Sequence, residues 1–164
     1  MVEEFHSVGS ASFVDRPKRV VVSGRKGKQA ELQFPSLFTA NGLNACVVVV
    51  WHYKGCFYAT DANCYHSAGA LERHEEDIEE ICNQPCIRCP QHKYIISITT
   101  GESFYEAVEI VLDKETNRRK IQSLGWKSKG IMQRTHNVKV EKGNVYIQLS
   151  DLSETLPSDQ YAYL

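Results

Sequence analysis

The sequence predicts an all-β domain, built as an antiparallel β-sandwich or small barrel. Three observations support this fold class: short runs of β-branched and aromatic residues recur along the chain, turn residues separate them, and helical periodicity is weak. The 164 residues, with 42% hydrophobic content, suffice for one packed domain and leave no room for two large ones.

The first predicted strands lie in the N-terminal half. Three consecutive valines in Arg19–Ser23 favour a strand. The runs Cys46–Tyr53 and Cys56–Thr60 are rich in β-forming residues, and Lys54-Gly55 joins them. Two such runs around a short glycine-containing turn predict a β-hairpin.

The second half contains further strand signals. Tyr94–Ile98 is apolar and β-branched, and the turn residues Thr100-Gly101-Glu102 follow it. Val138–Val140 and Val145–Leu149 alternate with period two around the turn at residues 141–144, which predicts a second hairpin.

Helical signals are confined to two segments. The apolar residues in Ala107–Lys120 have helical spacing, which is compatible with a short helix. Asp77–Ile81 fits either a helical face or a strand. Neither segment changes the all-β prediction.

The pattern places one domain between residues 19 and 150. Residues 1–18 are polar and mixed, and we expect a flexible N-terminal tail there. Residues 151–164 are expected to form a flexible C-terminal tail. No internal repeat or low-complexity block divides the predicted domain.

Charge and hydropathy exclude several function classes. Nineteen Lys and Arg residues against twenty Asp and Glu residues give a net charge of −1, which argues against a globally basic nucleic-acid binder. The longest apolar run, Cys46–Trp51, is far shorter than the roughly twenty residues of a membrane span. The first residues are acidic and lack an apolar signal-peptide core. We therefore expect a cytoplasmic protein with no membrane span and no nucleic-acid partner.

Six cysteines are the unusual feature of the composition. A reducing compartment keeps thiols reduced, so metal binding explains cysteines better than disulfides do. Four of them are interpreted as reduced thiols packed in or near strands, with a Cys82–Cys86 redox pair as the alternative. These four are Cys46, Cys56, Cys82 and Cys86.

The other two cysteines each lie beside a histidine, in Cys64-Tyr65-His66 and Cys89-Pro90-Gln91-His92. A structural zinc finger usually groups its cysteines together and its histidines together. Here each segment holds one thiol and one imidazole, and a two-iron cluster, with two cysteines on one iron and two histidines on the other, explains that arrangement better. A zinc site with the same four ligands remains the alternative.

The two segments resemble the Rieske [2Fe–2S] motif. Asp61-Ala62-Asn63 before the first pair, Gly69-Ala70-Leu71 after it, and the Thr100-Gly101-Glu102 turn are similar to the flanks in this family. The likeness runs from about Val20 to Leu149 and is greatest to the soluble Rieske-type ferredoxins of animals. It implies the all-β Rieske fold, with an antiparallel base and a small cluster-binding subdomain at about residues 61–103.

The resemblance also implies the ligands. Cys64 and Cys89 would ligate one iron of a single [2Fe–2S] cluster per chain, and His66 and His92 the other. The histidine-bound iron would lie nearest the surface. Electrons would then enter or leave through the imidazoles.

The chain departs from the family pattern at several positions. Lys93 stands where most Rieske sequences have glycine. Gly69 and Gln91 occupy the positions of two further cysteines that form a disulfide in respiratory Rieske proteins. Tyr94 and Ile96 replace a serine and a tyrosine whose hydroxyls raise the potential of high-potential members. We therefore predict a potential in the lower part of the Rieske range, roughly −150 mV to 0.

The function that the resemblance implies is one-electron transfer between a reductase and an oxygenase or another acceptor. A Rieske oxygenase needs a second, mononuclear iron domain, for which the chain has no room. We therefore expect no substrate chemistry of its own. An iron–sulfur or redox sensor and a zinc-stabilised interaction module are the alternatives.

An acidic run lies between the two cysteine–histidine segments. Residues 72–80 hold six acidic residues and one arginine. Such a run is usually a solvated face. The alternative is a docking patch for a basic reductase, because charge complementarity speeds encounter.

Overall fold

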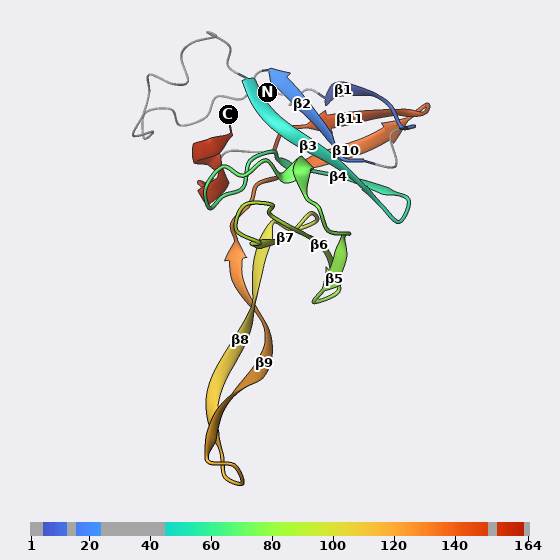
Figure 1. Cartoon of the computed structure of the whole chain (residues 1–164). Helices are drawn as coiled ribbons and strands as arrows, with labels where there is room; N and C mark the ends of the chain where they lie inside the picture. The colour runs from blue at the N-terminus through green and yellow to red at the C-terminus, as the bar shows by residue number, and fades with distance from the viewer. Residues whose placement is uncertain (1–4, 13–15, 24–44, 151–153, 163–164) are drawn as a thin grey trace.

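The computed structural model describes residues 5–12, 16–23, 45–150 and 154–162. Two antiparallel sheets make up most of it (Figure 1). One sheet has six strands in the order β1-β11-β10-β4-β3-β2, and the other has five in the order β5-β6-β7-β8-β9. The strands are β1 (Phe5–Ser10), β2 (Lys18–Ser23), β3 (Ala45–Tyr53), β4 (Cys56–Asp61), β5 (Glu79–Ile81), β6 (Gln84–Arg88), β7 (Ile95–Ser97), β8 (Glu102–Asp113), β9 (Arg118–Ile131), β10 (Thr135–Glu141) and β11 (Asn144–Gln148). The all-β prediction is confirmed.

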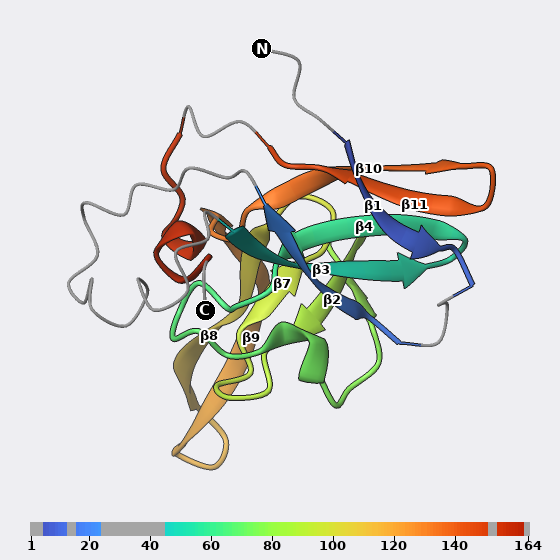
Figure 2. The same cartoon turned by 90° about the horizontal axis from the view of Figure 1, so that it is seen from above.

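Strand β3 passes through the centre of the core and is buried on both faces. Alternate residues of a strand point to opposite faces, so a strand covered on both sides has a continuous apolar sequence. One set of β3 side chains packs against β11, and the other packs against β6 and β7, which lie behind β3 in Figure 2. The first cluster includes Cys46, Val48, Val50, Val145 and Ile147; the second includes Val47, Val49, Trp51, Ile87 and Ile96.

Both predicted hairpins are present. In the first, β3 pairs with β4 from Val48↔Asp61 to Tyr53↔Cys56. In the second, β10 pairs with β11 from Asn137↔Gln148 to Glu141↔Asn144. Local turn residues define both connections, which explains why the sequence pattern identifies them.

The prediction of a flexible tail across residues 1–18 is wrong for residues 5–10, which form β1. This strand pairs with β11, and its register shifts between Ser7 and Gly9. Lys139 Nζ lies 4.3 Å from the Phe5 ring centroid, and Lys18 Nζ donates to the Val8 carbonyl at 2.6 Å. Pairing with the distant β11, rather than a local sequence pattern, places this strand.

The C-terminal segment is also more ordered than expected. Residues 157–161 form a short 3-10 helix, η4 (Pro157–Tyr161), inside the predicted tail. The buried Ser158 hydroxyl donates to Asp61 Oδ2 at 2.8 Å, and the Val47 N–H donates to the Ala162 carbonyl at 2.8 Å. These contacts are polar and lack periodicity, so no sequence pattern predicted them.

The short helix considered for Ala107–Lys120 is replaced by a hairpin. Residues 107–113 belong to β8 and residues 118–120 to β9, which pair across the turn between them. Asp113 Oδ1 accepts hydrogen bonds from the Glu115 and Thr116 N–H groups, at 2.9 and 3.2 Å. The period-two alternation of Val108, Ile110 and Leu112 outweighs the helical spacing once a partner strand is present. In the other ambiguous segment, residues 79–81 form β5, preceded by the 3-10 helix η3 (Leu71–Arg73).

Candidate metal centre

Two loops of matching backbone geometry carry the predicted ligands. The first follows β4 and holds Cys64 and His66; the second joins β6 to β7 and holds Cys89 and His92. In each loop the cysteine N–H donates to the carbonyl five residues later, at 2.8 Å. The cysteine carbonyl accepts from the N–H four residues later, at 2.9 Å in both loops. The two loops therefore present their side chains from equivalent turns.

Each turn contains one residue in the left-handed region. Ala68 has a φ of 59° and Lys93 a φ of 58°, each four positions after its cysteine. Glycine adopts this conformation without steric cost, whereas other L-residues do not. This is a physical reason for the glycine that the resemblance leads one to expect at the position of Lys93.

The four predicted ligand side chains meet between the loops. Cys64 and Cys89 are each 1% exposed, and their thiols hydrogen-bond to each other. His66 and His92 are exposed, and their ring centroids lie 4.8 Å apart. The structure thus brings all four residues together, with the sulfurs inside and the imidazoles at the surface.

Hydrogen bonds to the two sulfurs shift their pKa values in opposite directions. The hydrogen bond from the Cys64 thiol lowers the pKa of Cys89 to about 6. The same pairing, with burial, raises the pKa of Cys64. Backbone N–H groups of residues 66 and 67 donate to the Cys64 sulfur, and those of residues 91 and 92 donate to the Cys89 sulfur. Donors of this kind stabilise negative charge on sulfur, the form in which cysteine binds a metal.

Gly69 keeps space beside the thiols. A Cβ atom at this position would lie 2.6 Å from Cys89 Sγ and 3.3 Å from Gln91 Oε1. No side chain larger than hydrogen fits there without moving the sulfur. Two thiols and two imidazoles are the donor set of a Rieske cluster. The donors and the space at Gly69 therefore fit an iron–sulfur group.

Gln133 supports the first loop and was missed by the sequence analysis. Its side chain is fully buried, and its Oε1 accepts from the Tyr65 N–H at 2.9 Å. Its Nε2 donates to the Asp61 and Asn63 carbonyls, each at 2.9 Å. Gln133 is far from the first loop in the sequence and belongs to no motif, so the sequence analysis could not identify it.

Tyr94 and Lys129 form a second support that the sequence did not reveal. The Tyr94 ring stacks on His66, and Lys129 Nζ lies 4.5 Å from the Tyr94 ring centroid. Lys129 comes from β9, so this contact ties the long hairpin to the ligand loops.

The acidic run is largely paired within the chain. Its ion pairs join Glu72 to Arg19, Glu75 and Glu76 to Lys93, Glu76 and Glu79 to Arg88, and Glu80 to Lys54. The Arg88 partner holds the pKa of the Glu79 carboxyl below its usual value. These contacts connect the run to the second ligand loop, which favours the reading of a solvated face over that of a docking patch.

A second group of metal-binding residue types lies elsewhere in the core. Cys46, Asp61 and His136 are buried, with their ligand atoms within 4.8 Å of one another. His136 Nε2 lies 2.9 Å from Asp61 Oδ1, and His136 Nδ1 accepts from the Ser150 N–H at 3.1 Å. Both ring nitrogens thus have protein partners, and the group acts as a hydrogen-bond network that connects β4, β10 and the C-terminal segment.

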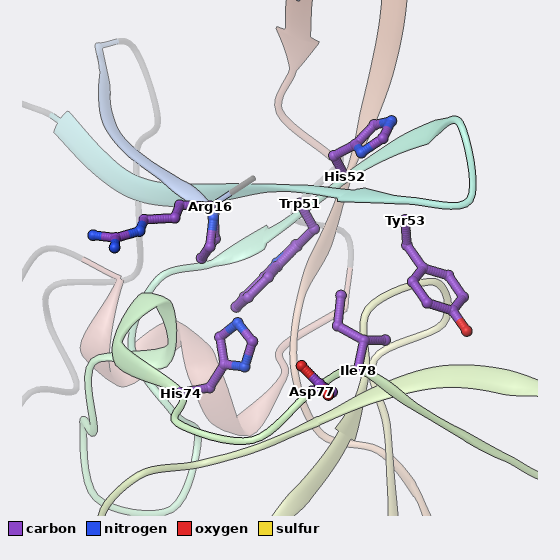
Figure 3. A pocket seen from close by; sticks show the side chains of 8 residues that line it. Arg16, Trp51, His52, Tyr53, His74, Asp77 and Ile78 are labelled. Atoms are coloured by element: carbon purple, nitrogen blue, oxygen red, sulfur yellow. The ribbon is translucent and has the colours of Figure 1, made fainter. Parts of the chain in front are cut away.

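A surface pocket of about 330 Å³ lies on the β3 side of the acidic run (Figure 3). Trp51 lines it, and His74 meets the Trp51 ring at a centroid distance of 5.5 Å. Arg16 and Asp77 also line it. None of its lining residues belongs to the two ligand loops, so this pocket is separate from the candidate centre.

No disulfide joins the other four cysteines, all of which lie in the described parts of the chain. Cys46 and Cys86 are buried, and Cys56 and Cys82 are exposed. Burial raises the pKa of Cys86 to about 12, which keeps this thiol protonated and unreactive. The structure therefore matches the interpretation of reduced thiols.

No helix in the described parts of the chain has the length and apolar character needed to cross a membrane.

Comparisons with known proteins show the family to which the chain belongs. The family model described as soluble Rieske-type ferredoxin matches residues 25–152. A human protein named Rieske domain-containing protein is 38% identical over 154 residues, which cover 94% of this chain and 90% of that protein.

Solved structures show the same fold at low sequence identity. A chain from the complex of reduced oxygenase and oxidised ferredoxin in carbazole 1,9a-dioxygenase has a TM-score of 0.52 and 18% identity, covering 92% of this chain and 99% of that one. The Sphingomonas yanoikuyae B1 ferredoxin has a TM-score of 0.50 and 18% identity, covering 90% and 100%. With the family match over most of its length, the chain belongs to the soluble Rieske-type ferredoxins.

Proposed function

We propose that the chain is a one-electron carrier that holds a single [2Fe–2S] cluster. Cys64 and Cys89 bind one iron, and His66 and His92 bind the other. The observation that carries this proposal is the convergence of two buried thiols and two exposed imidazoles from matching loops. Family membership supports the same donor set, since two His replace two Cys on one iron of a Rieske centre.

When bound, such a cluster accepts and releases one electron at a time. The protein determines where that exchange occurs. The buried cysteines keep the thiolate side away from water, and the exposed His66 and His92 form the surface through which a partner approaches. The backbone N–H groups that donate to the two sulfurs offset part of the negative charge that reduction adds.

We infer a reduction potential in the lower part of the Rieske range. Ile96 is fully buried and carries no hydroxyl to donate to a sulfur. Tyr94 stands where high-potential members have a serine, but it is larger than a serine and its ring stacks on His66. Fewer hydroxyl donors stabilise the reduced centre less, which favours a potential of roughly −150 mV to 0.

The partners we propose are a reductase as donor and an oxygenase or another protein as acceptor. The carbazole dioxygenase structure contains a reduced oxygenase together with an oxidised ferredoxin, a pairing that supports an acceptor of this class. A cytoplasmic location fits the absence of disulfides between the six described cysteines, because reducing compartments keep thiols reduced.

The test is electron paramagnetic resonance with iron and zinc assays on the purified protein, before and after dithionite. We expect a silent oxidised sample and a reduced signal with an average g value well below that of the free electron. A double variant, His66→Cys with His92→Cys, should lose that signal. His52→Gln, which changes a histidine on β3 outside the loops, should keep it.

Two results would reject the proposal. A colourless protein with stoichiometric zinc would support the interaction module instead. A Rieske-type signal that survives replacement of both loop histidines would reject the ligand assignment.

A further inference from the structure

The second ligand loop lies between two cations. Arg88, the last residue of β6, directly precedes Cys89, and Lys93 directly follows His92. The side chains of Arg88 and Lys93 are 27% and 48% exposed, so both remain in reach of other surface groups. A group that binds both cations therefore restrains the two ends of the loop relative to each other.

The carboxylate of Glu76 contacts both cations. Its Oε2 lies 3.1 Å from Arg88 Nε, and its Oε1 lies 3.3 Å from Lys93 Nζ. In the ion pairs of the described residues, the neighbouring acids each meet one cation. Glu79 accepts two hydrogen bonds from Arg88, and Glu75 lies 3.9 Å from Lys93 Nζ. Within the described parts of the chain, Glu76 is thus the residue that bridges the two ends of the loop.

Contacts with the core fix the position of Glu76. The His74 ring meets Trp51, a buried residue, at a centroid distance of 5.5 Å. His74 Nδ1 lies 2.7 Å from the Glu76 carbonyl oxygen, and because a carbonyl can only accept, this nitrogen donates. The His74 N–H donates to the Leu71 carbonyl at 3.1 Å, at the end of η3. A glutamate whose backbone is already held loses less conformational entropy on forming ion pairs than one on a mobile segment.

The first ligand loop has a support of a different kind. The buried side chain of Gln133 accepts from the Tyr65 N–H and donates to the Asp61 and Asn63 carbonyls. Salt screens exposed ion pairs, whereas it has little effect on hydrogen bonds inside the protein. The order of the second loop should therefore depend on ionic strength, and that of the first should not.

Lys93 gives Glu76 a side chain to hold at a strained position. Its φ of 58° is unfavourable for a residue with a Cβ atom, and glycine would adopt it without cost. Glycine, however, has no side chain that could pair with Glu76. The ion pair therefore opposes the strain that lysine brings to this turn.

We propose that Glu76 is a positioning residue for the second ligand loop and, through it, for His92. By bridging Arg88 and Lys93, it keeps the loop in the turn that presents Cys89 and His92 to the first loop. The acidic run then acts as a clasp on a ligand loop of its own chain. The role of His92 as a ligand rests on the proposed function, whereas the restraint on the loop does not.

The experiment compares Glu76→Gln with Glu75→Gln in the full chain. Both substitutions remove one negative charge at nearly constant side-chain size, and only the first breaks the bridge. Hydrogen–deuterium exchange, read by mass spectrometry, is measured on peptides covering residues 87–96 and 63–71, which contain the second and the first loop.

In Glu76→Gln, amide exchange in the second loop should be roughly two- to tenfold faster than in the wild type, because exposed ion pairs contribute modestly to local stability. Exchange in the first loop should not change. Glu75→Gln should match the wild type in both loops. Higher ionic strength should accelerate exchange in the second loop of the wild-type protein and leave the first loop unchanged.

Electron paramagnetic resonance of the same samples, reduced with dithionite, tests the effect on His92. Glu76→Gln should shift or broaden the g values, because His92 gains freedom, and Glu75→Gln should retain the wild-type spectrum. A wild-type sample without a Rieske-type signal would reject the proposed function, and the exchange comparison would still decide whether Glu76 holds the loop.

Where the wild type gives that signal, three results would overturn the proposal. The first is a Glu76→Gln protein that equals the wild type in second-loop exchange or in g values. The second is the same change in Glu75→Gln, which would show an effect of charge alone. The third is equal acceleration of the first loop, which would show a general loss of stability.

Discussion

The imidazole of His66 stacks on the phenol ring of Tyr94, with ring centroids 4.2 Å apart and an interplanar angle of 23°. Tyr65 meets the same phenol ring edge-on at 5.6 Å. Tyr65 is fixed in turn by a hydrogen bond of 2.7 Å between its hydroxyl and that of Ser103. This chain of contacts fixes the orientation of an otherwise exposed imidazole. Tyr94 therefore acts as a positioning residue for a proposed ligand.

Replacing Tyr94 tests this relationship. Tyr94→Leu removes the aromatic face and should broaden or shift the g values of the reduced protein, because His66 gains rotational freedom. Tyr94→Phe keeps the ring and should retain the wild-type spectrum. A Tyr94→Leu protein with g values and line widths equal to the wild type would show that the stacking does not orient His66.

Lys129 is expected to raise the reduction potential. Reduction adds a negative charge to the centre, and the Lys129 ammonium contacts the Tyr94 ring beside it at 4.5 Å. Lys129→Gln should lower the midpoint potential by roughly 10–40 mV, a small value because solvent and salt screen this exposed cation. Lys127→Gln, two residues before Lys129 on β9, is the matched control. Equal potentials for the two variants would contradict a specific role of Lys129.

Local sequence patterns predicted the parts of the structure that local chemistry determines. The β3–β4 turn at Lys54-Gly55 needs two residues with positive φ, and the pattern identified it. The ligand loops follow the same logic, since a cysteine and a histidine two or three residues apart already lie in one turn. Short-range spacing therefore revealed all four candidate ligands.

Long-range contacts explain what the sequence did not reveal. Strand β1 is placed by β11, more than 130 residues away in the chain. Gln133 reaches the first ligand loop from a position 68 residues beyond Tyr65. The β8–β9 hairpin depends on pairing between the two strands. The residue spacing within Ala107–Lys120, which is compatible with a helix, does not reveal that pairing. No periodic or motif signal marks any of these contacts.

Gly69 should tolerate no side chain. In Gly69→Ala the new Cβ would meet Cys89 Sγ at 2.6 Å, so the sulfur or the loop must move. Overpacking of this kind costs about 1–3 kcal/mol of the free energy of unfolding. Iron per chain should fall below the wild-type value, measured by colorimetric assay. Ser67→Thr adds one carbon at an exposed position of the same loop and should leave iron content unchanged; equal iron in both variants would contradict the prediction.

Gln133 should be a stability determinant despite lying outside the motif. Gln133→Leu removes three hydrogen bonds to buried backbone groups around the first loop. Each lost partner costs about 1–3 kcal/mol, so the free energy of unfolding should fall by about 3 kcal/mol or more. Gln122→Leu, at an exposed site on β9, should change it by less than about 0.5 kcal/mol. Urea unfolding measures both, and similar losses in the two variants would disprove this role.

Because each ligand loop contains a residue with left-handed backbone, replacing Ala68 by glycine should affect the free energy of unfolding differently from replacing a nearby extended residue. Ala68 has a φ of 59°, a conformation that costs an L-residue about 1–2 kcal/mol, whereas Ala70 is extended with a φ of −70°. Glycine at position 68 relieves that cost, although it adds freedom to the unfolded chain. Ala68→Gly should therefore leave the free energy of unfolding unchanged or raise it by up to about 1 kcal/mol.

Ala70→Gly is the matched control, because it makes the same change two residues away without relieving strain. It should lower the free energy of unfolding by about 0.5–1 kcal/mol. Urea unfolding of the two variants side by side gives the comparison. Equal destabilisation of both would mean that the turn imposes no strain on Ala68, and by the equivalence of the two loops none on Lys93 either.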